Sequence, residues 1–233
     1  MRVVIVLALL ARAAHAQDEF EIQVYDVETA ARGEPGVELH VNAHSITDAP
    51  DQLHVTLEPH YGLAAWLELG AYLQSATTAT GEVLFAGAKL RAKARRPGRL
   101  WRDRVGLAIN VELSYVPARF EPNVYGSEVR PIVDLAIGRL YAAVNPIVSI
   151  DLGGARAGTP DFEPAAKLGV RASRAVMLGA EGYAAFAATT SARAYAVVDA
   201  SGAWWDVNVG VGWAWGTSDR AVAKIIFGVH PRR

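Results

Sequence analysis

The sequence predicts an all-β protein, a single antiparallel transmembrane β-barrel of twelve strands with short periplasmic turns and longer extracellular loops. Three observations predict it. Apolar and polar residues alternate with a period of two from residue 36 onward, most of these segments are nine to thirteen residues long, and no stretch of 18 residues after the leader lacks charge. A period of two sends alternate side chains to opposite faces of a strand. A tilted strand crosses a bilayer in about 9 to 11 residues.

The N-terminal residues 1–16 predict a secretory signal peptide. A basic start is followed by an apolar run from Val3 to Ala11 and by the small residues Ala14 and Ala16, which suit cleavage before Gln17. The run is far shorter than the roughly 20 residues of a spanning helix. Residues 17–35 would follow as an N-terminal periplasmic segment, either an arm or an extra strand tucked against the barrel, and residues 36–230 would form the barrel.

Composition excludes several classes of function. The chain has no cysteine, which excludes disulfides, thiolate metal sites and a cysteine nucleophile. Once Arg2 and Arg12 leave with the signal peptide, 21 lysines and arginines remain against 24 acidic residues. This balance argues against nucleic acid as a partner.

The first strands alternate clearly. Residues 36–44 place Val37, Leu39 and Val41 on one face and polar residues on the other. The cleanest pattern, in residues 104–116, has Leu107, Ile109 and apolar neighbours at every second position. The twelve predicted strands cover residues 36–44, 53–61, 66–74, 81–96, 104–116, 128–138, 140–152, 161–172, 175–186, 191–200, 204–215 and 219–229.

The later segments carry the marks of a membrane wall. In residues 204–215, Trp205 lies at one end of the apolar face and Trp213 and Trp215 at the other. Aromatic girdles flank the apolar band of a transmembrane barrel, which is about 25 Å tall. Pro131 and Pro146 fall inside predicted strands on the apolar face, where proline removes a ladder hydrogen bond.

The connections between these segments alternate as well. Tight joins such as 62–63, 138–139 and 201–202 alternate with longer loops, of which 117–127 is the longest. Short turns on one side and longer loops on the other are typical of outer-membrane barrels. An even strand number then leaves both chain ends on the periplasmic side.

This pattern resembles bacterial outer-membrane β-barrel proteins over the whole range from Gly36 to Val229. The resemblance extends to porin-like barrels grouped with transporters, and it implies an outer-membrane location, contact with the lipid bilayer and insertion by the barrel-assembly machinery. Members of the class usually close the last strand with a terminal aromatic residue. Here Phe227 is followed by His230, Pro231 and two arginines, so the chain departs from that pattern.

Charges within the strands are expected to face the lumen, because an arginine or lysine on the lipid face costs about 2 to 4 kcal/mol at the bilayer midplane. The segment 81–96 shows this best, since four cations alternate there with alanine and leucine. Only Glu68 and Glu112 on the neighbouring strands are expected to pair with those cations. Two carboxylates cannot neutralise four cations, so a positively charged zone would remain in the lumen. The candidate pore-lining residues are Lys89, Arg91, Lys93, Arg95, Glu38, Glu58, Glu68, Glu112, Arg130, Asp134, Lys167, Arg171, Glu181, Asp206 and Lys224.

Three functions fit this lumen. Twelve strands lie between the eight that side chains fill and the 16 to 18 that hold a channel, which favours a narrow passive channel or a transporter of small charged solutes. A structural or partner-binding barrel with a lumen plugged by salt bridges is the alternative. An outer-membrane lipid hydrolase is a third, although the nearest sequence to a catalytic motif is His44-Ser45.

No cofactor is expected, and metal binding has weak support. Four histidines, His40, His44, His54 and His60, fall on the inner faces of the first two strands. If these strands form a hairpin, His44 and His54 come close together at its open end, and His40 lies lower, beside Leu57 or Glu58. Histidine and carboxylate are metal donors, but they also line wet lumens without any metal.

Overall fold

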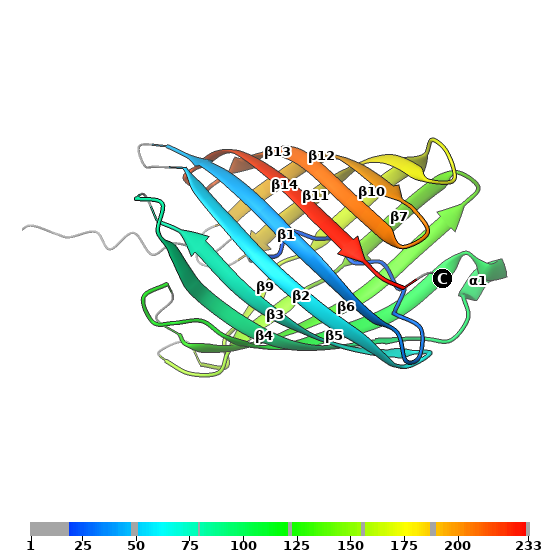
Figure 1. Cartoon of the computed structure of the whole chain (residues 1–233), viewed down its shortest axis with the longest axis horizontal. Coiled ribbons are helices and arrows are strands. Elements are labelled where there is room, and N and C mark those ends of the chain that lie inside the picture. Colours follow the sequence, from blue (N-terminus) through cyan, green and yellow to red (C-terminus); the bar gives the residue numbers. More distant parts are fainter. Residues whose placement is uncertain are drawn as a thin grey trace, which may run out of the picture.

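The computed structural model describes residues 19–47, 51–78, 80–120, 123–154, 157–186 and 190–231, and the predicted signal peptide lies outside them. Strands of the described residues form one sheet that closes on itself (Figure 1). The strands are β1 (Pro35–Ile46), β2 (Gln52–Ala64), β3 (Leu67–Thr77), β4 (Val83–Arg95), β5 (Val105–Tyr115), β6 (Tyr125–Ile137), β7 (Leu140–Asn145), β8 (Val148–Asp151), β9 (Pro160–Phe162), β10 (Ala165–Arg171), β11 (Val176–Phe186), β12 (Thr190–Ser201), β13 (Trp205–Trp215) and β14 (Asp219–Val229).

Two of the wall strands are interrupted at prolines. Pro146 lies between β7 and β8, which both pair with β6, and Pro164 lies between β9 and β10, which both pair with β11. Proline has no N–H for the ladder, so each wall strand breaks there and resumes. Each pair of halves counts as one wall strand, and the predicted twelve-stranded antiparallel barrel is confirmed. Pro131, in contrast, stays inside β6, opposite Ile109.

The barrel closes through its first and last strands. β1 pairs with β2 on one side and with β14 on the other, and both pairings are antiparallel. Leu39, for example, lies opposite Leu57 of β2 and Phe227 of β14. Among the strands that the structure describes, each wall strand is paired on both sides.

The two faces of the wall differ as the alternation predicts. In β5, Ile109, Val111 and Leu113 point outward and are between 39% and 55% exposed, whereas Asn110 and Glu112 point inward and are at most 1% exposed. An exterior covered with leucine, valine and aromatic side chains suits hydrocarbon and not water. No helix among the described residues is long and apolar enough to cross a membrane.

The two ends of the barrel have different connections. Turns of two to four residues follow β2, β6, β10 and β12, while the longer turn after β4 contains α1 (Leu100–Asp103). In α1, Trp101, Arg102 and Asp103 all have positive φ, so this element is not a regular helix. We call this side the turn end and the opposite side the loop end; the final strand β14 finishes at the turn end (Figure 1).

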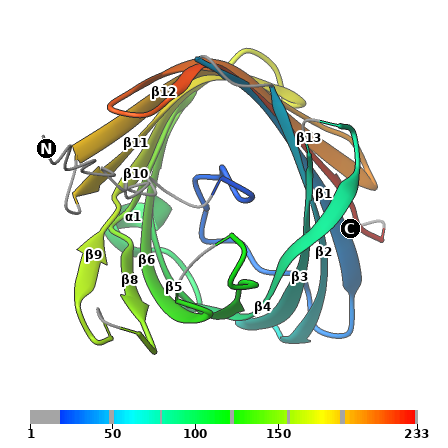
Figure 2. The same ribbon diagram turned by 90° about the vertical axis from the view of Figure 1, so that its left-hand side faces the viewer.

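The N-terminal segment departs from the prediction. The sequence favours a periplasmic segment for residues 17–35. The described residues 19–34 instead lie inside the barrel, enclosed by the ring of strands, as an irregular coil (Figure 2). Their side chains contact the inner wall, so the lumen contains a plug made of the protein's own chain. We call residues 19–34 the plug segment.

Candidate functional site: the barrel lumen and its plug segment

The plug segment extends from the loop half of the lumen to the turn end. Near its start, the Glu19 carbonyl oxygen lies 3.1 Å from the Asn42 side-chain nitrogen and 3.3 Å from His54 Nδ1. The Phe20 ring stacks on His54 with 4.4 Å between ring centres. Near its end, the Gly33 N–H donates to the Gly62 carbonyl at the turn end of β2, at 2.7 Å. The segment therefore passes through most of the barrel's length.

Two glycines allow the segment to join the wall. Gly33 has φ of +85°, a left-handed conformation that favours glycine and turns the chain from the lumen into β1. Gly62 lies against the segment, and a Cβ atom there would collide with the carbonyl oxygen of Ala31. The close approach of the two backbones thus requires glycine at position 62.

Apolar side chains of the segment pack against an apolar part of the inner wall. Ile22 and Val24 share a buried cluster with Tyr183, Tyr195 and neighbouring residues, and Val27 belongs to a second cluster around Ile132. Full burial of one such side chain stabilises by about 1.5–3 kcal/mol. Apolar packing therefore fixes the segment to this part of the wall, and polar contacts fix it to the opposite part.

Tyr25 makes the densest set of contacts. Its backbone N–H donates to Asn145 Oδ1 at 2.7 Å, and its carbonyl accepts from Asn145 Nδ2 at 3.0 Å. Its hydroxyl bonds to that of Tyr72, and the Arg130 guanidinium lies 4.3 Å from the ring centre. Asn145 is the last residue of β7, beside the Pro146 break, so the interruption of this wall strand lies next to the plug.

The four cations of β4 are all paired, and the plug segment supplies three of the partners. Lys89 Nζ lies 3.2 Å from Glu21 and 3.0 Å from Glu112, and Arg91 pairs with Glu58 and Glu68 at 2.5 and 2.6 Å. Further toward the turn end, the partner of Lys93 is Asp26 at 3.5 Å, and that of Arg95 is Glu28 at 3.2 Å. The expectation that only Glu68 and Glu112 pair with the four cations of β4 is therefore wrong. The lumen contains a segment that the strand pattern does not include, and this segment supplies further carboxylates.

These pairs differ in strength. Glu21, Lys89 and Arg130 are buried, whereas the side chains of Asp26 and Glu28 are about half exposed. Removing one partner of a buried pair typically costs 3–5 kcal/mol, while an exposed pair contributes about 0–1 kcal/mol. The segment is therefore held tightly at Glu21 and loosely at the turn end.

Glu21 is the carboxylate at the centre of this arrangement. Burial raises its pKa, but Arg130 at 3.2 Å and then Lys89 outweigh that effect and hold the pKa below its ordinary value. Glu21 is therefore ionised at neutral pH and carries a full negative charge into the middle of the lumen.

A second network lies on the opposite wall. Glu181 bonds to Lys224 and lies 3.1 Å from Lys167, which also reaches Asp199 at 2.6 Å. Lys224 Nζ donates to the Ile22 carbonyl at 2.8 Å, which ties this network to the plug segment.

Other predicted lumen residues lie nearer the turn end. Asp134 pairs with Arg99 of the turn after β4, and Asp206 lies 3.1 Å from His230. Arg171 is exposed at the end of β10, with its guanidinium 6.0 Å from the Tyr141 ring centre. The structure thus divides the predicted set into a buried central part and a partly solvated rim.

Three of the four histidines, His40, His44 and His54, lie where the hairpin prediction places them. His44 and His54 have ring centres 4.8 Å apart, and His40 Nε2 lies 3.0 Å from Glu58. His60 lies over Gly36 in the wall of the cavity described below. Ser45 follows His44 on the strand and projects to the other face, so the two do not form a catalytic pair.

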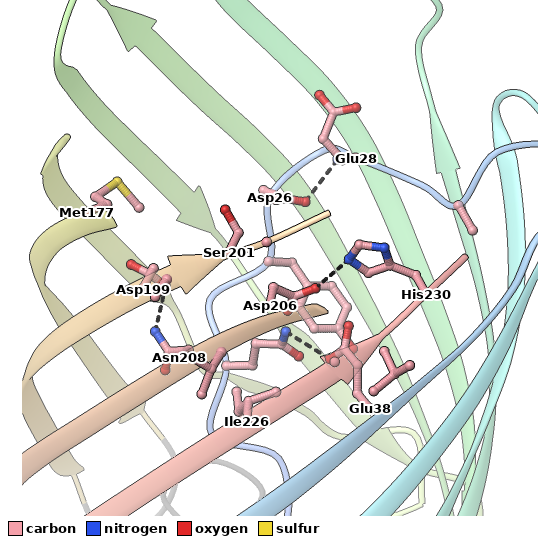
Figure 3. A pocket seen from close by; sticks show the side chains of 18 of the residues that line it. Asp26, Glu28, Glu38, Met177, Asp199, Ser201, Asp206, Asn208, Ile226 and His230 are labelled. Atoms are coloured by element: carbon pink, nitrogen blue, oxygen red, sulfur yellow. Dashed lines mark hydrogen bonds and ion pairs between the residues drawn. The ribbon is translucent and has the colours of Figure 1, made fainter. Parts of the chain in front are cut away.

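A cavity of about 520 Å³ lies in the turn-end half of the lumen, between the plug segment and the wall. Figure 3 shows carboxylates that line it, among them Asp26 of the plug segment and Glu38 and Asp199 of the wall. Above it, Glu21 and Ile22 of the segment and Asn110 and Asn145 of the wall are all 0% exposed. Segment and wall residues therefore cover one another at that level.

Sequence reasoning missed the residues that the plug segment places in the lumen. They are Glu19, Glu21, Tyr25, Asp26 and Glu28 of the segment. One signal was available, since residues 19–34 hold five carboxylates against one arginine, the complement of the basic ladder on β4. Arg193 and Asp219, paired at 2.8 Å near the loop end, were also absent from the candidate set.

No protein-family profile and no curated protein sequence matches the chain. Solved structures do match its fold. An outer membrane channel from Pseudomonas putida F1 has a TM-score of 0.68 at 8% identity, covering 90% of this chain and 100% of that one.

Two porins match as well. NanC porin has a TM-score of 0.55 at 8% identity, covering 84% of this chain and 99% of the porin. KdgM porin in complex with disordered oligogalacturonate has a TM-score of 0.53 at 9% identity, with 84% and 99% covered. Identities this low show the fold alone, and the chain has the fold of outer-membrane β-barrels.

Proposed function

We propose that the protein is a narrow outer-membrane channel for small charged solutes, closed in this conformation by its own plug segment. The observation that carries the proposal is the pairing of Glu21, Asp26 and Glu28 with the cations of β4. These carboxylates occupy the positions that an anionic solute would take in the lumen. Withdrawal of the segment would leave Lys93 and Arg95 without these partners and would remove one of the two carboxylates that pair with Lys89.

The contacts of the plug segment with the wall become weaker from Glu21 toward the turn end, which favours release of the segment from that end first. Asp26 and Glu28 make half-exposed pairs and border the cavity, so they separate from the wall at low cost. Glu21, Ile22 and Tyr25 are fully or nearly buried, so complete withdrawal is rare. The proposal therefore predicts brief openings and not a permanently open pore.

The ladder also suggests the class of solute. Four cations on one strand attract carboxylate-bearing molecules, and a row of like charges in a pore selects for the opposite sign. A porin of the same fold was solved with oligogalacturonate, a carboxylate-bearing oligomer. We propose anionic organic solutes, and we expect insertion by the barrel-assembly machinery.

The test is current through the purified protein in a planar lipid bilayer. Wild-type protein should show brief openings, and a variant lacking residues 19–30 should show long-lived openings of higher conductance. Heat-modifiable migration on gels checks that the variant is folded. A folded variant that passes no current would contradict the channel and support a barrel with a structural role.

A structural role remains the alternative because the buried networks are extensive. Arg130, Lys224 and Arg193 are among the largest fully buried side chains, and each contacts the plug segment. Such networks stiffen a barrel without any transport. Brief openings of the wild type separate the two functions, because a barrel with a structural role stays closed while the plug segment is in place.

A further inference from the structure

Glu38, His40 and Glu58 converge on one point of the inner wall, independently of whether the lumen conducts. His40 Nε2 lies 3.0 Å from an oxygen of Glu58 and 3.5 Å from one of Glu38, and the three donor atoms all lie within 4.8 Å of one another. The strand register places Glu38 directly opposite Glu58. Like charges opposite each other on paired strands repel, so this position favours a bound cation.

The neighbouring cation does not fill the position between the two carboxylates. Arg91 binds the other oxygen of Glu58, through Nε at 2.6 Å, and also reaches Glu68. Among the described residues, the Gln23 amide lies a long 3.4 Å from the same Glu38 oxygen that faces His40. Arg91 thus pairs with Glu58 and Glu68, while a separate oxygen of Glu58 and one oxygen of Glu38 lie at His40 Nε2.

We infer that His40 Nε2 and one oxygen each of Glu38 and Glu58 form a binding site for a divalent transition-metal ion such as Zn²⁺. Imidazole and carboxylate are donors that zinc takes in proteins, with bonds of about 2.0–2.2 Å. Tetrahedral coordination at these lengths separates two donor atoms by about 3.4 Å. The separations of 3.0 and 3.5 Å are close to that value, so an ion fits with small side-chain movements.

The surroundings supply support and access. Arg91 holds the distal oxygen of Glu58 and so orients the proximal one, as groups around metal ligands commonly do. The cavity is lined by Glu38 and Glu58, and the Glu38 side chain is 21% exposed (Figure 3). An ion can therefore enter from the turn end and keep a water molecule on the cavity side as its fourth ligand.

A second group of the same residue types provides a contrast. Glu19, His44 and Asp219 also bring donor atoms within 4.8 Å of one another. There, however, the Arg193 guanidinium lies 3.1 Å from Glu19 and 2.8 Å from Asp219, so a cation already occupies the space between the carboxylates. The inference therefore concerns the Glu38 group alone.

The experiment is calorimetric titration of the full-length protein in detergent with ZnCl₂, after treatment with a chelator. Wild type should bind one Zn²⁺ per chain, more weakly at acidic pH because protons compete for the ligands. Glu38→Gln should weaken binding at least about tenfold, the lower limit for changes around metal sites. The matched control Glu19→Gln should bind as wild type does.

Glu38→Gln keeps the size of a partly exposed side chain, so it should leave the barrel intact, and heat-modifiable migration verifies this. Visible absorption of Co²⁺ gives a second readout, since the tetrahedral spectrum should vanish in Glu38→Gln and persist in Glu19→Gln. Absence of Zn²⁺ binding by the wild type would overturn the inference. So would wild-type affinity in folded Glu38→Gln, or an equal loss in Glu19→Gln.

Discussion

Tyr25 shows how single residues hold the plug segment in place. Both of its backbone polar groups bond to one side chain, Asn145, inside a fully buried environment. A buried backbone group that loses its partner costs about 1–3 kcal/mol. Asn145 therefore contributes to closing the lumen although it touches no ion and carries no charge.

Asn145→Ala should loosen the segment without disturbing the barrel. Loss of both hydrogen bonds shifts the closed–open balance by about 1–3 kcal/mol, or about 5–150-fold. Open probability in planar bilayers measures this shift. The control is Asn208→Ala, which removes an inward asparagine bonded to Glu181 and Asp199 and not to the segment. Equal open probabilities in the two variants would show that Asn145 does not hold the closed state.

Low pH should weaken the binding of the plug segment to the wall at Glu21. Because the folded-state pKa of Glu21 is lowered, its stabilisation of the plugged state is present above its ordinary pKa of about 4.5 and is lost as pH falls below it. The groups that face Glu21 are Lys89, Arg130, His40 and Tyr25 together with the like-charged Glu112.

We therefore expect open probability to rise as the pH drops through this window. In Glu21→Gln, open probability should be high already at neutral pH, and the rise on acidification should be smaller. A pH response identical in wild type and Glu21→Gln would assign it to other groups.

Among the elements, β4 is the one whose charge pattern would decide selectivity in the proposed channel. Its outer cations Lys93 and Arg95 are paired only with Asp26 and Glu28 among the ion pairs of the described residues, and both partners belong to the segment. Once the segment withdraws, these two cations face the solute. The inner cations Lys89 and Arg91 keep Glu112, Glu58 and Glu68 on the wall.

Replacing Lys93 and Arg95 with Gln should shift the reversal potential in a salt gradient toward cation preference. The variant should remain folded, because each lost pair is at least partly exposed. Arg102→Gln, on the outer turn, is the control and should leave selectivity unchanged. If the double variant conducts with wild-type selectivity, Lys93 and Arg95 do not line the conduction path.

A neighbouring pair in β13 tests the assignment of faces. Val209 points outward and Asn208 points inward toward Glu181 and Asp199. Val209→Arg should impair assembly by about 2–4 kcal/mol if it lies near the bilayer midplane, whereas Asn208→Arg gains two acidic neighbours and should assemble. Yield of heat-modifiable protein in the membrane measures both. Equal yields would contradict the orientation of the strand.

The elements were predictable from sequence and the plug segment was not, for a physical reason. A strand such as β5 shows its two faces through a local period of two, because lipid excludes charge from every second position. The contacts of Glu21 with Lys89 and Arg130 join residues 68 and 109 positions apart and leave no local period. The breaks at Pro146 and Pro164 are local, but whether a proline interrupts a strand depends on its ladder partners, as the intact β6 at Pro131 shows.

For the whole molecule, closure of the sheet and filling of the lumen are separate features. The ring of strands is complete without residues 19–34, since β1 to β14 pair all the way round. The plug segment adds buried apolar side chains and ion pairs inside that ring. A barrel built in this way can change its permeability without changing its wall.

The most direct test of the account is to fix the segment in place and record current. A Cβ atom on Gly106 would lie 2.5 and 3.1 Å from the two Cγ atoms of Val27, and 2.5 Å from Asp134 Oδ1, which would have to shift. Cysteines at positions 27 and 106 would therefore lie close enough for a disulfide, in which the two Cβ atoms are about 3.8 Å apart. The chain has no other cysteine to interfere. Single-channel recordings would compare Val27→Cys/Gly106→Cys, oxidised and then reduced, with each single variant.

The account predicts that the oxidised double variant shows no openings, that reduction restores them, and that the single variants open under both conditions. Openings that persist in the protein with a verified disulfide would contradict the central claim that movement of the plug segment opens the lumen.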